Sequence, residues 1–345
     1  MTMVPRIVQV GNGQYRKYGH TRVSWVHKLY RGLVQNCCPV YFYSDRDTAA
    51  FEAPFGLRDL GKRTANRRLR ETIRAQEPDL LILCHCDIIR NETVAALRDE
   101  RPNMTVVDCN NDPMFVPENI ARIRSRLAVV DAVFTSTGRR AALGAVGDTG
   151  GIPVYHMPNP VDAGIECADV SQKPSEALDY DLVFCGKASE HSDRMTRLEF
   201  LYRTLDDELR FAVRGCFGQP NVWGLDYDRL LAASKMGLSL NRQEGWEWYA
   251  SARMAQLVGN GLLTFCHRGT GFDSLFPDES VVYFETDAEL LERIREFHRD
   301  DAKRRAWAAH ARAFMHAEFS VSRFASWIVE RSLGLPLSHR YAWNH

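Results

Sequence analysis

The 345-residue sequence has no long hydrophobic run, no net charge and no CxxC pair. Its longest apolar runs, such as DLLILC and RLAVVDAVF, are the size of strands and fall far below the roughly 20 residues that a membrane-spanning helix needs. The start, MTMVPRIVQVG, enters a strand pattern at once, without the basic region and apolar stretch of a secretory signal. We therefore expect no transmembrane segment and a cytoplasmic protein, with peripheral contact at the inner face of the membrane left open.

The nine cysteines are an odd number in a long chain, so we interpret them as reduced thiols. The triplet CHC, formed by Cys84, His85 and Cys86, is at best a weak metal signal. Buried small hydrophobic side chains are the favoured interpretation, because free cysteine is among the most buried residue types. The sequence therefore predicts no metal site.

The two halves of the chain differ in charge. Residues 1–150 hold 22 Lys and Arg against 16 Asp and Glu, whereas residues 151–345 hold 22 against 28. A basic N-terminal half favours an anionic ligand or surface. The densest basic run, GKRTANRRLR at 61–70, is interpreted as a solvated helix face in preference to a binding site. Neither half is basic enough to indicate a nucleic acid partner.

Short β-rich runs alternate with helical stretches along most of the chain. RIVQVG, PVYFYS, DLLILC, MTVVDC, DAVFTS and PVYHMP are candidate strands, and the alternation restarts at DLVFCG and continues to LLTFC. This pattern predicts an α/β protein of two Rossmann-like, doubly wound domains, each with a parallel sheet covered on both faces. We place the N-terminal domain at 1–158 and the C-terminal domain at 159–330, facing one another across a cleft, with the tail 331–345 packing back on the first.

Two familiar motifs carry little weight in this sequence. The loop GNGQYR begins like a dinucleotide-binding fingerprint, but Arg16 stands where the last glycine belongs. The DRD triplet at 45–47 resembles a metal-binding DxD, yet the same spacing recurs at 179–181 and 226–228 and carries little weight. Neither a nicotinamide or flavin cofactor nor a divalent metal is expected.

In open parallel sheets, ligands bind beyond the carboxyl ends of the strands. His85 follows the strand DLLILC, and Asp112 follows MTVVDC. Each could deprotonate an acceptor hydroxyl, so they are the first two candidates for a catalytic base. His20, near the helix that follows the first glycine loop, is the third. Turn formation before proline and helix capping stay open as structural alternatives for these positions.

The second half carries a candidate anion site. Gly186 and Lys187 directly follow a strand, where glycine lets a phosphate approach the backbone and lysine supplies a charge. In SARMAQLVGNG, at 251–261, Ser251 can cap a helix. Arg253 would lie in its first turn, where a cation opposes the helix dipole unless an anion is bound there. The segment therefore predicts contact with a diphosphate.

Several stretches together resemble a known family. FCGK, VWGLDYDRLLAASKMGLSLNR, RMAQLVGNGLLTF and the closing helices are similar to the donor domain of GT-B glycosyltransferases, in particular the CgeB-like group of glycosyltransferase group 1. The likeness is strongest over residues 181–330. It implies a nucleotide sugar as co-substrate, without a metal or other cofactor. The donor-binding residues that we infer from the motifs and this resemblance are Gly186, Lys187, Arg214, Trp223, Tyr227, Asn241, Arg242, Glu247, Ser251, Ala252, Arg253 and Gln256.

The expected activity is transfer of a hexosyl or related sugar to a hydroxyl of a bacterial glycan or glycolipid, as in polysaccharide biosynthesis. Two departures from the family pattern leave alternatives open. Gln256 and Ala255 stand where the family has Glu and Phe, and the Glu pair spaced by eight in many retaining enzymes is absent. A nucleotide-sugar epimerase of the same fold and a catalytically silent binding module are the other hypotheses.

Overall fold

The computed structural model describes residues 4–21, 24–189, 192–205 and 207–344, and it forms two compact units. Unit 1 consists of residues 1–158 with 321–345, and unit 2 of residues 159–320. The chain thus returns to unit 1 at residue 321, ten residues before the expected boundary at 330. Among the described residues, none of the helices is both long and apolar enough to span a bilayer.

Unit 1 is built on a parallel sheet of six strands in the order β2-β1-β3-β4-β5-β6. Every residue of β1 and β3 is buried, because helices cover both faces of the sheet. The strands are β1 (Ile7–Gly11), β2 (Val40–Ser44), β3 (Leu80–Cys84), β4 (Thr105–Asn110), β5 (Ala132–Thr135) and β6 (Val154–His156). The helices are α1 (Trp25–Gln35), α2 (Asp45–Phe51), α3 (Arg58–Gln76), α4 (Asn91–Glu100), α5 (Pro117–Arg126), α6 (Arg139–Val146) and α12 (Val321–Leu333).

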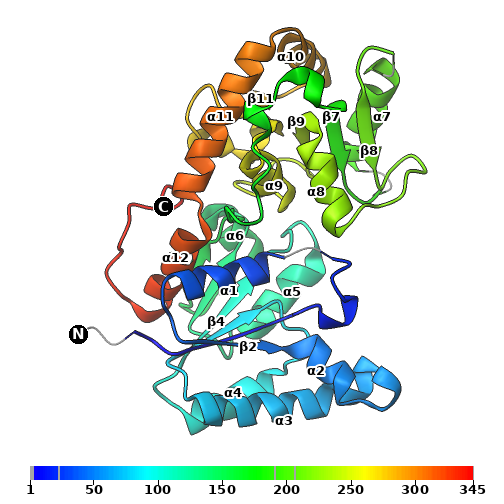
Figure 1. The fold of residues 1–345 in the computed structure, drawn as a ribbon. Coiled ribbons are helices and arrows are strands. Elements are labelled where there is room, and N and C mark those ends of the chain that lie inside the picture. The colour runs from blue at the N-terminus through cyan, green and yellow to red at the C-terminus, as the bar shows by residue number, and fades with distance from the viewer. Residues whose placement is uncertain (1–3, 22–23, 190–191, 206, 345) are drawn as a thin grey trace. The chain divides into compact units, whose positions relative to one another are not determined.

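Helix α12 lies beside α1 in unit 1 (Figure 1). The two helices approach so closely that a Cβ on Gly32 would lie 2.0 Å from the carbonyl oxygen of Val321, so only glycine fits there. The indole of Trp327 donates a hydrogen bond to the carbonyl of His156, at 2.9 Å. In the tail that follows, Tyr341 and Trp343 are buried against Trp327. The last helix and the tail therefore belong to the packing of unit 1.

Unit 2 has a parallel sheet of five strands in the order β11-β10-β9-β7-β8. One face packs on α7, α10 and α11, and the other packs on α8 and α9. The strands are β7 (Tyr180–Cys185), β8 (Phe211–Arg214), β9 (Ser234–Ser239), β10 (Leu263–His267) and β11 (Val282–Phe284). The helices are α7 (Asp193–Leu205), α8 (Gly224–Ala232), α9 (Arg253–Gly259), α10 (Asp287–Arg299) and α11 (Asp301–Glu318).

Candidate active site

Arg253 is the best-anchored cation at the carboxyl ends of the unit 2 strands. Its Nε donates to the carbonyl of Cys185, at 2.7 Å, and an Nη donates to the carbonyl of Leu240, at 3.0 Å. Its guanidinium carbon lies 4.6 Å from the centroid of the Phe184 ring. Burial lowers the pKa of Arg253, but arginine stays protonated at neutral pH. No carboxylate among the described residues pairs with it, so its charge is available to an anion.

Arg194, in the first turn of α7, is a second cation on the same ring. It is 7% exposed, its guanidinium carbon lies 5.8 Å from the Phe184 centroid, and an Nη donates to the carbonyl of Lys187, at 2.6 Å. Burial, and then the charge of Arg253, lower the pKa of Arg194 to about 10. Arg194 and Arg253, called here the arginine pair, are therefore a buried and a half-buried cation on one ring, and a bound anion would relieve their repulsion.

The glycine after β7 leaves the room that this arrangement needs. A Cβ on Gly186 would lie 2.8 Å from an Nη of Arg253. The neighbouring Gly215, with a φ of +83°, is equally tight, since a Cβ there would lie 2.6 Å from the carbonyl oxygen of Gly186. Glycine at both positions therefore keeps the backbone open beside the guanidinium of Arg253.

Tyr227 and Gln256, both expected near the donor, contact each other. The Tyr227 hydroxyl donates to Oε1 of Gln256, at 3.0 Å, and burial raises the pKa of Tyr227 well above its usual value. With Oε1 accepting from Tyr227, the Gln256 Nε2 has no acceptor among the described residues and can donate to a ligand.

The prediction that Ser251 caps the helix is wrong. Helix α9 begins at Arg253, its N-cap is Ala252 in a helical conformation, and no side chain caps it. The hydroxyl of Ser251 is instead buried without a hydrogen-bond partner. Helix α9 therefore begins one residue later than the Ser-Ala-Arg pattern suggests.

The other predicted donor residues line the loops after β7, β8 and β9. Lys187, Arg242 and Trp223 are exposed, and Glu247 is half-buried. Three of the predicted residues have local roles in the structure. Arg214 donates to the carbonyl of Val213, Asn241 fixes its loop by donating to the carbonyl of Tyr249, and Ala252 is the N-cap.

Sequence reasoning also missed a buried carboxylate in this region. Burial raises the pKa of Glu244 to about 7, although Arg197 lies 3.3 Å from its Oε1. Oε2 lies 3.9 Å from Nδ1 of His267. Glu244 therefore titrates near neutral pH in the loop that leads to α9, and only tertiary packing reveals it.

In unit 1, the structure brings His85 and Asp112 into contact. Nδ1 of His85 lies 2.6 Å from Oδ2 of Asp112. Arg122, which sequence reasoning missed, lies 3.0 Å from Nε2 of His85, from Asp112 and from Asn110. Because guanidinium only donates, Nε2 of His85 must accept and Nδ1 must carry the proton. Burial raises the pKa of Asp112, but hydrogen bonds from His85 and Arg122 outweigh it and lower the pKa below the usual value.

His20 is exposed and is not part of this cluster. The first glycine loop is held instead by His27, whose Nε2 lies 3.1 Å from the carbonyl oxygen of Gly13. The amide of Gly13 donates to the hydroxyl of Ser44, and that hydroxyl donates to Asp47. In the DRD triplet, Asp47 is therefore used by the loop, while Asp45 is fully buried.

The comparisons with known proteins agree with this architecture. Residues 194–330 match the family model described as glycosyl transferase-like. Anabaena HepE, solved with UDP and glucose, is 14% identical with a TM-score of 0.58, and the match covers 96% of this chain and all of HepE. Sucrose-phosphate synthase from Thermosynechococcus elongatus is 10% identical with a TM-score of 0.61, over 94% of this chain and 98% of that one.

AviGT4, a glycosyltransferase involved in avilamycin A biosynthesis, is 14% identical with a TM-score of 0.56, over 96% of this chain and 98% of AviGT4. A comparison with curated proteins finds no match. The chain therefore has the GT-B fold of two Rossmann-like units, and the segment 194–330, which contains the arginine pair, is similar to the glycosyl transferase-like family.

Proposed function

We propose that the protein is a metal-independent glycosyltransferase. It moves a sugar, hexosyl or related, from a nucleotide-activated donor to a hydroxyl of a bacterial glycan or glycolipid in the cytoplasm. The observation that carries the proposal is the arginine pair, a buried and a half-buried cation without a carboxylate partner among the described residues, at the carboxyl ends of parallel strands. HepE, which shares the fold, was solved with UDP, with UDP and glucose, and with UDP-glucose.

The arginine pair supplies the chemistry that the leaving group needs. When the bond between the sugar's anomeric carbon and the diphosphate oxygen breaks, negative charge develops on the nucleoside diphosphate. Preorganised cations in a water-poor site stabilise that charge, so a divalent metal is not required. Lys187, Arg214 and Arg242 add charge nearby, Gln256 donates to the ribose, and Trp223 or Tyr227 flanks the base.

Unit 1 supplies the base. As the acceptor oxygen bonds to the anomeric carbon, its proton passes to Nε2 of His85, and Asp112 stabilises the resulting imidazolium through Nδ1. Arg122 donates a hydrogen bond to Nε2 of His85 in the structure, so the acceptor hydroxyl must replace Arg122 as the donor before transfer. An anionic acceptor that draws Arg122 away would achieve this exchange.

The test incubates the full chain with UDP-, GDP-, ADP-, CMP- and dTDP-sugars, with and without a mixture of glycan acceptors, in the presence of EDTA. We expect one nucleotide to bind, with its release accelerated by acceptor and a glycosylated product formed. Conversion of the donor sugar without acceptor would identify an epimerase instead. Binding without turnover would indicate the silent module, and no binding to any nucleotide would refute the donor site.

A further inference from the structure

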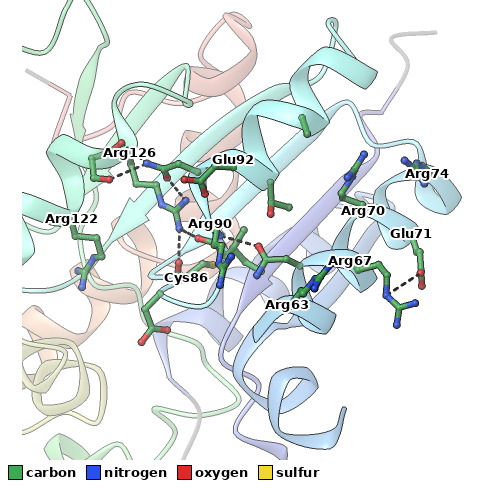
Figure 2. A pocket seen from close by; sticks show the side chains of 17 residues that line it. Arg63, Arg67, Arg70, Glu71, Arg74, Cys86, Arg90, Glu92, Arg122 and Arg126 are labelled. Carbon is green, nitrogen blue, oxygen red and sulfur yellow. Dashed lines mark hydrogen bonds and ion pairs between the residues drawn. The ribbon is translucent and has the colours of Figure 1, made fainter. Parts of the chain in front are cut away.

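A second concentration of arginines lies on unit 1, on the face formed by α3, α4 and α5. A pocket of about 1060 Å³ lies there, and Figure 2 shows the side chains that line it; we call this pocket the arginine groove. Seven arginines line it, against three carboxylates, Glu71, Asp87 and Glu92. The arginines are Arg63, Arg67, Arg70, Arg74, Arg90, Arg122 and Arg126.

Part of this charge is neutralised, because Arg70 and Arg74 pair with Glu100 and Arg122 pairs with Asp112. The rest is not. Arg63 and Arg90 have no ion pair among the described residues, and Arg67 approaches Glu71 only to 4.0 Å. Arg126 is 5% exposed, and its guanidinium donates to Asn91 Oδ1 and to the carbonyls of Cys86 and Ile89, which are all neutral acceptors. A buried cation held only by neutral groups keeps the groove positive and favours an anionic occupant.

The helix α3 presents its charge in one row. Four arginines of α3 are spaced by three and four residues, and Leu60 precedes them at the same spacing, so all five share a helix face over roughly 20 Å. The arginines are Arg63, Arg67, Arg70 and Arg74. This face is turned away from the core, since the buried residues of α3 lie on its other side. The N-terminal part of this row, where Arg63 and Arg67 have no close acidic partner among the described residues, therefore offers positive charge to an anionic surface.

Exposed apolar side chains stand at the N-terminal end of the same row. Phe55 is 96% exposed, Phe51 62%, Leu60 61% and Leu57 55%. Phe55 also has a φ of 56°, a strained conformation for a non-glycine residue that holds it in the turn before α3. Large apolar groups beside a row of arginines match a membrane interface, where acyl chains lie next to phosphate.

We infer that the arginine groove and the apolar residues before it dock unit 1 onto an anionic phospholipid surface, with lipid phosphates in the groove. The inference goes beyond the proposed glycosyl transfer and does not depend on it. The phosphates contact Arg63, Arg67 and Arg90, while Phe55 and Phe51 enter the acyl region.

The experiment measures cosedimentation of the full chain with vesicles of phosphatidylcholine alone or mixed with phosphatidylglycerol. We expect binding only to the anionic vesicles, and weaker binding in high salt. The double variant Arg63→Gln/Arg67→Gln should bind on the order of 30-fold more weakly, the factor expected for two charges at such a surface. Phe55→Ser should weaken binding about tenfold through lost apolar burial.

The matched control removes two exposed arginines elsewhere, Arg139→Gln/Arg203→Gln, and should leave binding unchanged. Thermal denaturation checks that each variant is folded. Equal binding to neutral vesicles, no vesicle binding, or equal losses in the control variant would overturn the inference. Calorimetric titration with pyrophosphate distinguishes a soluble ligand: pyrophosphate binding that needs Arg63 and Arg67, without vesicle binding, would also overturn it.

Discussion

Replacing Arg253 by methionine tests the donor site most directly. Methionine keeps an unbranched side chain over the Phe184 ring but removes the charge and the donors to Cys185 and Leu240. A hydrogen bond to a charged group contributes about 1.5–3 kcal/mol. The dissociation constant of the nucleotide should therefore rise about 10- to 150-fold.

The assay is isothermal titration calorimetry with the nucleotide that binds the wild-type protein most tightly. The control is Arg203→Met, which removes the same charge from α7, where the side chain is 77% exposed. It should leave the dissociation constant unchanged, because surface charges at that exposure contribute little. Arg194→Met should weaken nucleotide binding like Arg253→Met.

Stability needs a separate measurement, since Arg253→Met leaves two carbonyl oxygens without their donor. Each unpaired group costs about 1–3 kcal/mol, offset in part by removal of a buried charge. Thermal denaturation without ligand reports this loss, and titration well below the melting transition excludes it from the binding result. A folded Arg253→Met protein that binds the nucleotide within twofold of wild type would refute the placement of the diphosphate.

Two further predictions concern unit 1. Burial raises the pKa of Asp45 from 3.8 to about 6, so the folded state favours the neutral acid and its stability falls as pH rises from about 4 to 6. In urea unfolding, the Asp45→Asn variant should therefore be more stable than wild type by up to about 3 kcal/mol at pH 8, and no more stable below pH 4. The control is the exposed Asp99→Asn variant, whose stability should not show this dependence on pH. Equal stability of Asp45→Asn and wild type at pH 8 would contradict the prediction. Nitrogen NMR of histidine-labelled protein should show that His85 carries its proton on Nδ1 and none on Nε2. The Arg122→Gln variant should change the Nε2 signal, because Arg122 donates to that atom. A proton on Nε2 in the wild-type protein would contradict the assigned hydrogen bonds.

The strand pattern was sufficient to predict the two parallel sheets, because strands that are buried on both faces are continuously apolar. It also predicted that His85 and Asp112 each follow a strand, at the carboxyl ends of the sheet. Their contact follows from the pairing of β3 with β4, which the structure shows. Arg253 stood out because a charge was out of place in an otherwise apolar segment. In each case the information is local or follows from the order of the strands.

The partners of these residues were not predictable in the same way. Arg194 lies in the first turn of an amphipathic helix, and its sequence position is typical of a solvated side chain. Only the packing of α7 against Phe184 buries it. Arg122 lies in a helix with basic residues on several sides, so nothing in its pattern indicates contact with His85. The basic run at 61–70 was interpreted as a solvated face, and its position beside α4 and α5 became evident only in three dimensions.

The opposite charges of the two halves do not decide where anions bind. Residues 151–345 carry an excess of acidic residues, yet the arginine pair lies among them without a carboxylate partner. Charges at the surface are screened beyond about 8 Å at physiological ionic strength, whereas buried charges interact in a medium of low dielectric constant. The two cations on Phe184 therefore determine the local potential, and the acidic surface of the unit does not prevent a diphosphate from binding there.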